Sequence, residues 1–146
     1  MFRERAAGEL APTPGLDGLL AWCDARGLRT AAVTNAPRLN AEFILRCINR
    51  STWFEHLIIG DECARGKPEP DPYLEAMSRA GLSPAECVAF EDSPSGARAA
   101  VAAGVYTVGI LSGQRAERLR EAGCGMLVES FDDERLWRAL RAAVEG

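Results

Sequence analysis

The chain has 146 residues, 47% of them apolar and 26% charged, which is typical of one globular domain with a sizeable core. A net charge of −4 argues against nucleic acid, or an anionic membrane, as a partner held by bulk charge. Five scattered cysteines (Cys23, Cys47, Cys63, Cys87 and Cys124) form no C-x-x-C pair, so we expect reduced thiols.

Helical and strand-like patterns alternate along the chain. Thr13-Pro14 predicts a helix start with proline at the first helical position, and Gly27 suits the end of that helix. Further helices are predicted at about 40–48, 72–80, 94–103, 114–122 and 133–144, and strands at 28–33, 57–59, 87–90, 105–110 and 126–128. Short apolar strands alternating with helices predict an α/β fold, a parallel sheet with helices on both faces. In such sheets the ligand site lies at the carboxyl ends of the strands.

Polar residues directly follow the first predicted strand and also lie in the loop after the second one. Thr34 and Asn35 follow the first strand, where a hydroxyl and backbone N–H groups can hold a phosphate oxygen. Ordinary turn and cap chemistry is the alternative interpretation. Lys67 lies in the proline-rich loop 66–72, where it would neutralise charge on a transferred phosphoryl group. The alternative is a solvated surface lysine, although three prolines in five residues would be costly for that purpose.

Adjacent carboxylates follow a third apolar strand. Glu91 and Asp92 precede Ser93-Pro94, which starts a helix. Hard oxygen ligands at a strand end suit Mg²⁺, which takes one or two carboxylates together with water and phosphate oxygens. The alternative is that Asp92 or Ser93 only caps the next helix.

Taken together and in this order, the three segments resemble the haloacid-dehalogenase superfamily of aspartyl-phosphate phosphohydrolases. Within it, the chain looks like the sugar-phosphate phosphatases related to β-phosphoglucomutase. The stretches that carry this resemblance are Val33-Thr34-Asn35-Ala36-Pro37-Arg38, Ile59-Gly60-Asp61-Glu62-Cys63, Gly66-Lys67-Pro68 and Phe90-Glu91-Asp92-Ser93. The resemblance covers nearly the whole chain and implies a Rossmann-like core.

The resemblance also implies roles for individual residues. Thr34, with the backbone or amide of Asn35, would bind the transferring phosphoryl group, and Lys67 would screen charge between phosphate and nucleophile. Asp92, assisted by Glu91, would hold Mg²⁺. These groups position the reactants and stabilise charge but do not perform the covalent step.

The first motif of the superfamily, an Asp-x-Asp-Gly after an apolar strand, is absent from this sequence. Its first Asp would be the nucleophile and its second the general acid and base. The nearest imitation has Gly15 in the nucleophile position, so Asp17 is expected to be a first-turn helix residue. We therefore expect a truncated chain, with 1–12 a remnant of a cap or linker and 13–146 the core. Loss of the first-motif strand would expose edges in the middle of the sheet, which makes self-association an open expectation.

Several other residues are expected to be structural. His56 is predicted to pack or lie at the surface, Cys63 to be an ordinary thiol, and Arg38 to lie on a helix surface rather than on phosphate.

The expected function is a Mg²⁺-dependent phosphatase of sugar or polyol phosphates in the complete protein. A phosphosugar mutase and an inactive module that binds phosphate or a partner are the alternatives. The expected partner is a small phosphate ester, with no nucleic acid and no membrane. No apolar run is long enough to span a membrane, and the first residues lack the apolar core of a signal peptide. We therefore expect a cytoplasmic location, with organelle targeting left open if the true start lies upstream.

Overall fold

The computed structural model describes residues 14–39, 41, 42, 54–111 and 116–145. The predicted remnant 1–12 and most of the predicted helix 40–48 lie outside these residues, as do Cys47 and the start of the predicted helix 114–122. The described α-helices are α1 (Leu16–Ala25), α3 (Asp71–Ala80), α4 (Pro94–Ala102), α5 (Ala116–Glu121) and α6 (Glu134–Glu145), with short 3₁₀ turns at Gly60–Glu62 and Pro84–Glu86.

The strands form two parallel sheets. One contains β1 (Ala31–Thr34) and β2 (His56–Ile59), and the other has the order β3 (Val88–Glu91), β4 (Tyr106–Ile110), β5 (Met126–Val128). The predicted α/β class with parallel strands is confirmed. Among the described residues, β1 and β3 do not pair with each other, and each keeps one edge without a partner strand.

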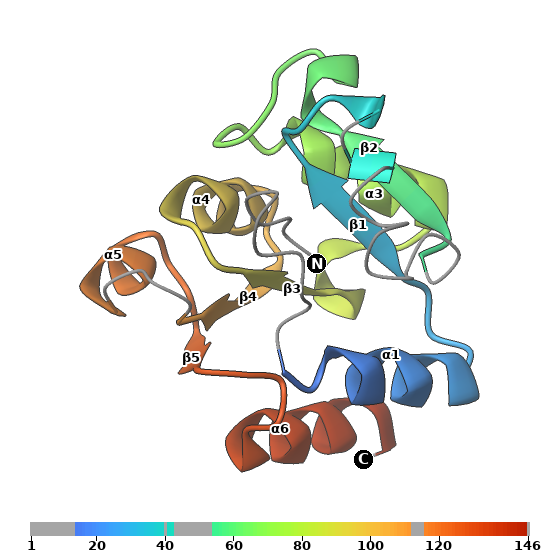
Figure 1. Ribbon diagram of the computed structural model, residues 1–146, viewed down its shortest axis with the longest axis vertical. Helices are drawn as coiled ribbons and strands as arrows, with labels where there is room; N and C mark the ends of the chain where they lie inside the picture. The colour runs from blue at the N-terminus through green and yellow to red at the C-terminus, as the bar shows by residue number, and fades with distance from the viewer. Residues whose placement is uncertain (1–13, 40, 43–53, 112–115, 146) are drawn as a thin grey trace.

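Helices cover both faces of the strands (Figure 1). Consecutive residues of β3 separate the two faces: Phe90 packs with the helices α1 and α6, and Ala89 packs with α3 and α4. This alternation follows from the two-residue period of a strand. Trp22 of α1 and Trp137 of α6 meet edge to face with ring centroids 5.4 Å apart, which joins the two helices.

The start of α1 differs from the prediction. The helix begins at Leu16, and Gly15 before it has a φ of 89°, so Pro14 is not the first helical residue. The Pro14 carbonyl instead accepts a hydrogen bond from the Phe131 N–H at 3.0 Å. A Cβ on Gly15 would lie 2.8 Å from the backbone nitrogen of Asp132, so a long-range contact fixes this turn. Asp17 lies in the first turn of α1, as expected.

β5 matches its prediction, the bounds of the other strands shift by up to three residues, and one of these shifts matters for the site. The third strand was expected to end at Phe90, but β3 includes Glu91, which lies opposite Gly109 of β4. Glu91 therefore belongs to the sheet rather than to the loop, and its side chain points into the interior with the residue only 1% exposed.

Candidate active site

Lys67 is a buried lysine. Its side chain is 6% exposed, which excludes the alternative of a solvated surface lysine. The ammonium donates to the Val33 carbonyl at 2.9 Å and to Glu91 Oε2 at 2.7 Å. Within the described part of the chain, these contacts use two of its three N–H donors. The ammonium thus lies between the carboxyl-terminal halves of β1 and β3, the edge at which the ligand site was expected.

Tyr73, which sequence reasoning missed, completes this cluster. The tyrosine lies in the first turn of α3, is 1% exposed, and donates its hydroxyl to Glu91 Oε2. Burial, and then the neighbouring Glu91 carboxylate, raise the pKa of Tyr73 well above its ordinary value, so the phenol keeps its proton and acts as a donor. A tyrosine on the core face of a helix requires a partner for its hydroxyl, and this was the available signal.

Asn35 holds the loop that contains Lys67 (66–70, called the lysine loop below) against the end of β1. Its amide oxygen accepts from the Lys67 N–H at 3.1 Å, and its amide nitrogen donates to the Lys67 carbonyl at 3.2 Å. Two glycines make room for this side chain: a Cβ on Gly60 or Gly66 would lie 2.1 or 2.9 Å from the amide oxygen. The amide is therefore engaged with protein, and only the backbone of Asn35 is left for its predicted phosphate-binding role.

Thr34 is the last residue of β1, and Asp92 directly follows β3. Thr34 is 6% exposed, and its hydroxyl oxygen accepts from the Ala36 N–H at 3.0 Å, which is the turn chemistry weighed as the alternative. Asp92 is half-buried. Ser93 rather than Asp92 caps α4, since its hydroxyl accepts from the Gly96 N–H at 3.1 Å. Asp92 is therefore not the cap of α4, and its metal role stays a prediction.

The carboxylates at the end of β3 are compatible with a magnesium ion. Glu91 Oε1 is buried and has no hydrogen-bond partner among the described residues, because Lys67 and Tyr73 both bind Oε2. Asp92 adds a second carboxylate, and Mg²⁺ needs only one or two of them with waters and a phosphate. The described residues contain no group of three or more His, Cys, Asp or Glu side chains arranged for a metal. Glu91 and Asp92 would therefore be a partial ligand set, completed by other oxygens.

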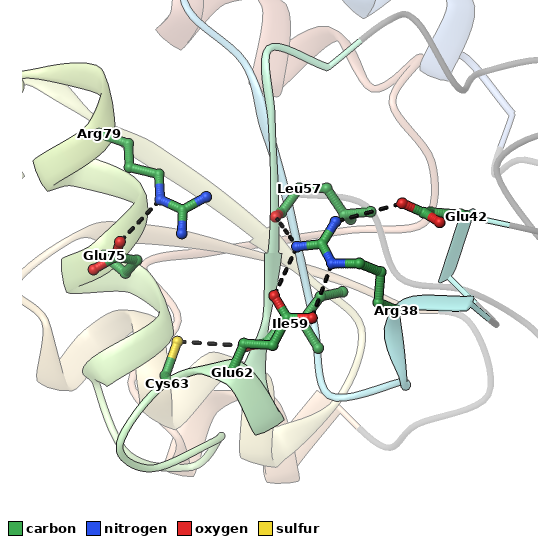
Figure 2. A network of polar contacts seen from close by, with 8 residues as sticks. All are labelled: Arg38, Glu42, Leu57, Ile59, Glu62, Cys63, Glu75 and Arg79. Atoms are coloured by element: carbon green, nitrogen blue, oxygen red, sulfur yellow. Dashed lines mark hydrogen bonds and ion pairs between the residues drawn. The ribbon is translucent and has the colours of Figure 1, made fainter.

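Arg38 belongs to a second, exposed cluster of charges (Figure 2). Its guanidinium donates two 2.8 Å bonds to the Glu62 carboxylate and contacts Glu42 at 3.5 Å and the Leu57 carbonyl at 3.4 Å. These contacts hold the segment after β1 against the end of β2. The arginine is thus used for structure, as expected, rather than aimed at a ligand.

The described cysteines are free thiols, in agreement with the expected reduced state. Burial raises the pKa of the Cys63 thiol, and the neighbouring carboxylates Glu75 and Asp71 raise it further. A thiol with a raised pKa is a poor nucleophile, which supports its structural assignment. His56 is 25% exposed at the start of β2, with its Nε2 4.0 Å from Glu55.

An open cleft of about 400 Å³ lies at the carboxyl ends of β4 and β5. Its lining includes Glu129, Asp132 and Asp133 and only one basic residue, Arg135, which is paired with Asp133 at 2.9 Å. Negative charge there repels a phosphate ester. None of the predicted site residues lines this cleft, so the candidate site remains the cluster around Lys67.

Comparisons with known proteins identify the family of this chain. A family profile described as haloacid dehalogenase-like hydrolase matches residues 2–104. Protein CbbY of Rhodobacter capsulatus is 40% identical over 106 residues, which are 70% of this chain and 47% of that protein. A phosphorylated carbohydrates phosphatase of Thermotoga maritima is 33% identical over 122 residues, 82% of this chain and 56% of that protein. A Thermotoga maritima crystal structure named for β-phosphoglucomutase superposes with a TM-score of 0.80 at 30% identity, covering 90% of this chain and 61% of the other.

The chain belongs to the haloacid dehalogenase-like hydrolases, and its relatives fall among the phosphatases and β-phosphoglucomutase-like proteins. The predicted family and subgroup are confirmed. It spans about half the length of the curated relatives it matches. In its described part, no helix is both long and apolar enough to cross a membrane.

Proposed function

We propose that this chain supplies the phosphate-binding and metal-binding half of a Mg²⁺-dependent phosphatase that acts on sugar or polyol phosphates. The observation that carries the proposal is the buried ammonium of Lys67, fixed between β1 and β3, with one of its three N–H donors unused by the described residues. Lysine is almost never buried unless it is paired, and this pair lies at the sheet edge where the ligand site of such folds is found. The Thermotoga maritima relative is named as a phosphatase of phosphorylated carbohydrates, which supports the substrate class.

In this proposal each residue acts on charge or position. The third N–H of Lys67 binds a phosphoryl oxygen and neutralises charge as it builds during transfer. Thr34 and the Asn35 backbone orient the phosphoryl group, while the Asn35 amide holds the lysine loop in register. A pre-positioned cation and donors of this kind act mainly by fixing the geometry of the reacting groups.

Magnesium would be held by Asp92, with Glu91 Oε1 as the second carboxylate oxygen. Both are hard oxygen ligands at the carboxyl end of β3, and Glu91 Oε1, which has no hydrogen-bond partner among the described residues, supports this assignment. When bound, the ion supplies additional positive charge at the phosphoryl oxygens.

The covalent step requires a nucleophile that these 146 residues do not offer as an Asp-x-Asp-Gly motif. An aspartyl-phosphate mechanism is therefore proposed for a protein in which such a segment accompanies this chain. The intact mass of the protein isolated from its source, compared with the 15.7 kDa of these residues, tests that part directly. A mass near 15.7 kDa would remove the aspartyl-phosphate mechanism and favour the inactive binding module.

Phosphate release from a panel of sugar and polyol phosphates, measured with the naturally isolated protein and with variants at its natural length, tests the activity. We expect release to require Mg²⁺ and to fall about 100-fold or more in Asp92→Asn and in Lys67→Ala. Asp61→Asn and Arg65→Ala are matched controls, because they remove exposed charges close by in the sequence.

Two other outcomes would decide for the alternatives. Conversion of a sugar phosphate into its isomer without release of phosphate would identify a phosphosugar mutase. Binding of inorganic phosphate without turnover of any substrate would identify a binding module. Full activity of Lys67→Ala would contradict the proposed role of the lysine in any of these functions.

A further inference from the structure

Tyr73 contacts the site lysine in two ways. Its hydroxyl donates to Glu91 Oε2, the oxygen that Lys67 Nζ binds at 2.7 Å. Lys67 Nζ lies over its ring, 5.7 Å from the ring centroid, within the range of a cation–π contact. The other tyrosine, Tyr106, is 49% exposed and lies at the start of β4. Tyr73 is therefore the tyrosine of this chain that is built into the polar interior.

Both donors converge on one oxygen of Glu91. The other oxygen, Oε1, lies against Gly96, where an added Cβ would come within 2.0 Å. With Lys67 as its only partner, the carboxylate could tilt or shift while it keeps its bond to the ammonium. Tyr73 supplies a second donor from a rigid helix, so a shift of the carboxylate would break that bond as well. The hydroxyl thereby holds the position and the plane of the carboxylate that faces Lys67.

Lys67 needs such a constraint because a lysine side chain is long and flexible. Asn35 holds the backbone of the lysine, and the Val33 carbonyl accepts one ammonium proton at 2.9 Å. Glu91 accepts a second ammonium proton, and the position of the Glu91 carboxylate depends on its bond to Tyr73. Removal of the hydroxyl would leave the ammonium attached but less well placed.

We propose that Tyr73 is a positioning residue for Lys67, acting through its hydroxyl bond to Glu91. The inference rests on the proposed function for its catalytic consequence, but the fixed position of the lysine can be measured without activity. Lys67 is the only lysine of these 146 residues, and Lys67→Arg assigns its side-chain ammonium signal after selective nitrogen-15 labelling of lysine.

The first measurement is the exchange rate of the Lys67 ammonium protons with water, observed by NMR. In the unaltered protein we expect slow exchange, and a cross-relaxation signal between these protons and a protected tyrosine hydroxyl proton. In Tyr73→Phe, which keeps the ring, exchange should become about tenfold faster, since a bond to a charged group is lost. Met77→Leu, a substitution in the core face of the same helix, should leave the exchange rate unchanged.

The second measurement is steady-state kinetics of the protein at its natural length. Tyr73→Phe should lower kcat about 10- to 100-fold with KM nearly unchanged, because a small misplacement of a positioned group acts on the reacting state. Tyr106→Phe and Met77→Leu should match the unaltered protein.

An unchanged exchange rate in Tyr73→Phe, or the absence of a protected tyrosine hydroxyl in the unaltered protein, overturns the inference. The hydroxyl measurement needs no variant, so it decides even if Tyr73→Phe does not fold. The protein could lack phosphatase activity and still show slow exchange that depends on Tyr73. That result would support the positioning role and contradict only the proposed function.

Discussion

Two clusters of ion pairs in this molecule use the same chemistry in opposite surroundings. In the buried cluster, the side chains of Lys67 and Glu91 are 6% and 1% exposed, with nitrogen and oxygen 2.7 Å apart. In the exposed cluster of Figure 2, Arg38 and Glu62 are 38% and 46% exposed at 2.8 Å. The distances are nearly equal, but water screens only the second pair. The comparison teaches that burial, rather than distance, decides what the loss of one partner costs.

The largest effect is expected for Glu91→Gln, which leaves the buried ammonium of Lys67 without its counter-charge. We expect the free energy of unfolding to fall by about 3–5 kcal/mol, measured by urea denaturation. The cause is the desolvation of an unpaired charge in the interior. Glu62→Gln is the matched control in the exposed pair, and the comparison fails if both variants lose the same amount.

A double substitution sharpens this result. Lys67→Met together with Glu91→Leu replaces both charges with apolar side chains, so no unpaired charge remains. The double variant should therefore lose less stability than either single substitution, although it should lack activity. A loss equal to the sum of the two single losses would contradict this account.

A smaller effect is expected where the backbone packs against the buried carboxylate. In Gly96→Ala the new Cβ would meet Glu91 Oε1 at 2.0 Å, so the carboxylate or the start of α4 must shift. Such overpacking should cost about 1–3 kcal/mol in thermal or urea unfolding. Gly18→Ala, also within a helix but with no atom near the new Cβ, should instead stabilise by about 0.5–1 kcal/mol. Equal effects of the two would show that the Glu91 contact is irrelevant.

The smallest effect is expected in the exposed cluster and depends on pH. The hydrogen bond from Arg38, and then its charge, lower the pKa of Glu62. A lowered pKa means that this contribution to stability is present above the unfolded pKa and lost as pH falls through the folded one. Glu62→Gln should therefore lower Tm slightly at pH 7, and the difference should vanish well below about pH 4. A difference that grows in acid would refute the assignment.

Much of the fold followed from local patterns. Gly27, predicted to end the first helix, has a φ of 66° just after α1, and each described strand overlaps its prediction. The start of α1 was wrong because Gly15 and Pro14 are set by contacts with Phe131 and Asp132, far away in the sequence. Local propensity carries no information on such contacts.

Most residues of the candidate site could be predicted from the sequence, but the contacts between them could not. The sequence pointed to Thr34, Lys67 and the Glu91–Asp92 pair because each follows a strand or lies in a stiff loop. Their roles remain predictions. Tyr73 escaped notice because, in the sequence, it is one more aromatic residue at the start of an amphipathic helix. Its proposed role depends on a hydrogen bond to Glu91, 18 residues further along the chain.

The sequence by itself determined the alternation of strands and helices, the carboxyl-end location of the polar motifs and the hydrolase family. These follow from short-range periodicity and from residue types in a fixed order. Only the tertiary structure decided that Lys67 is buried, that Asn35 holds its loop, and that Arg38 pairs with Glu62. The physical reason is that burial and pairing arise between segments 24 to 34 residues apart, which meet only when the strands and helices pack together.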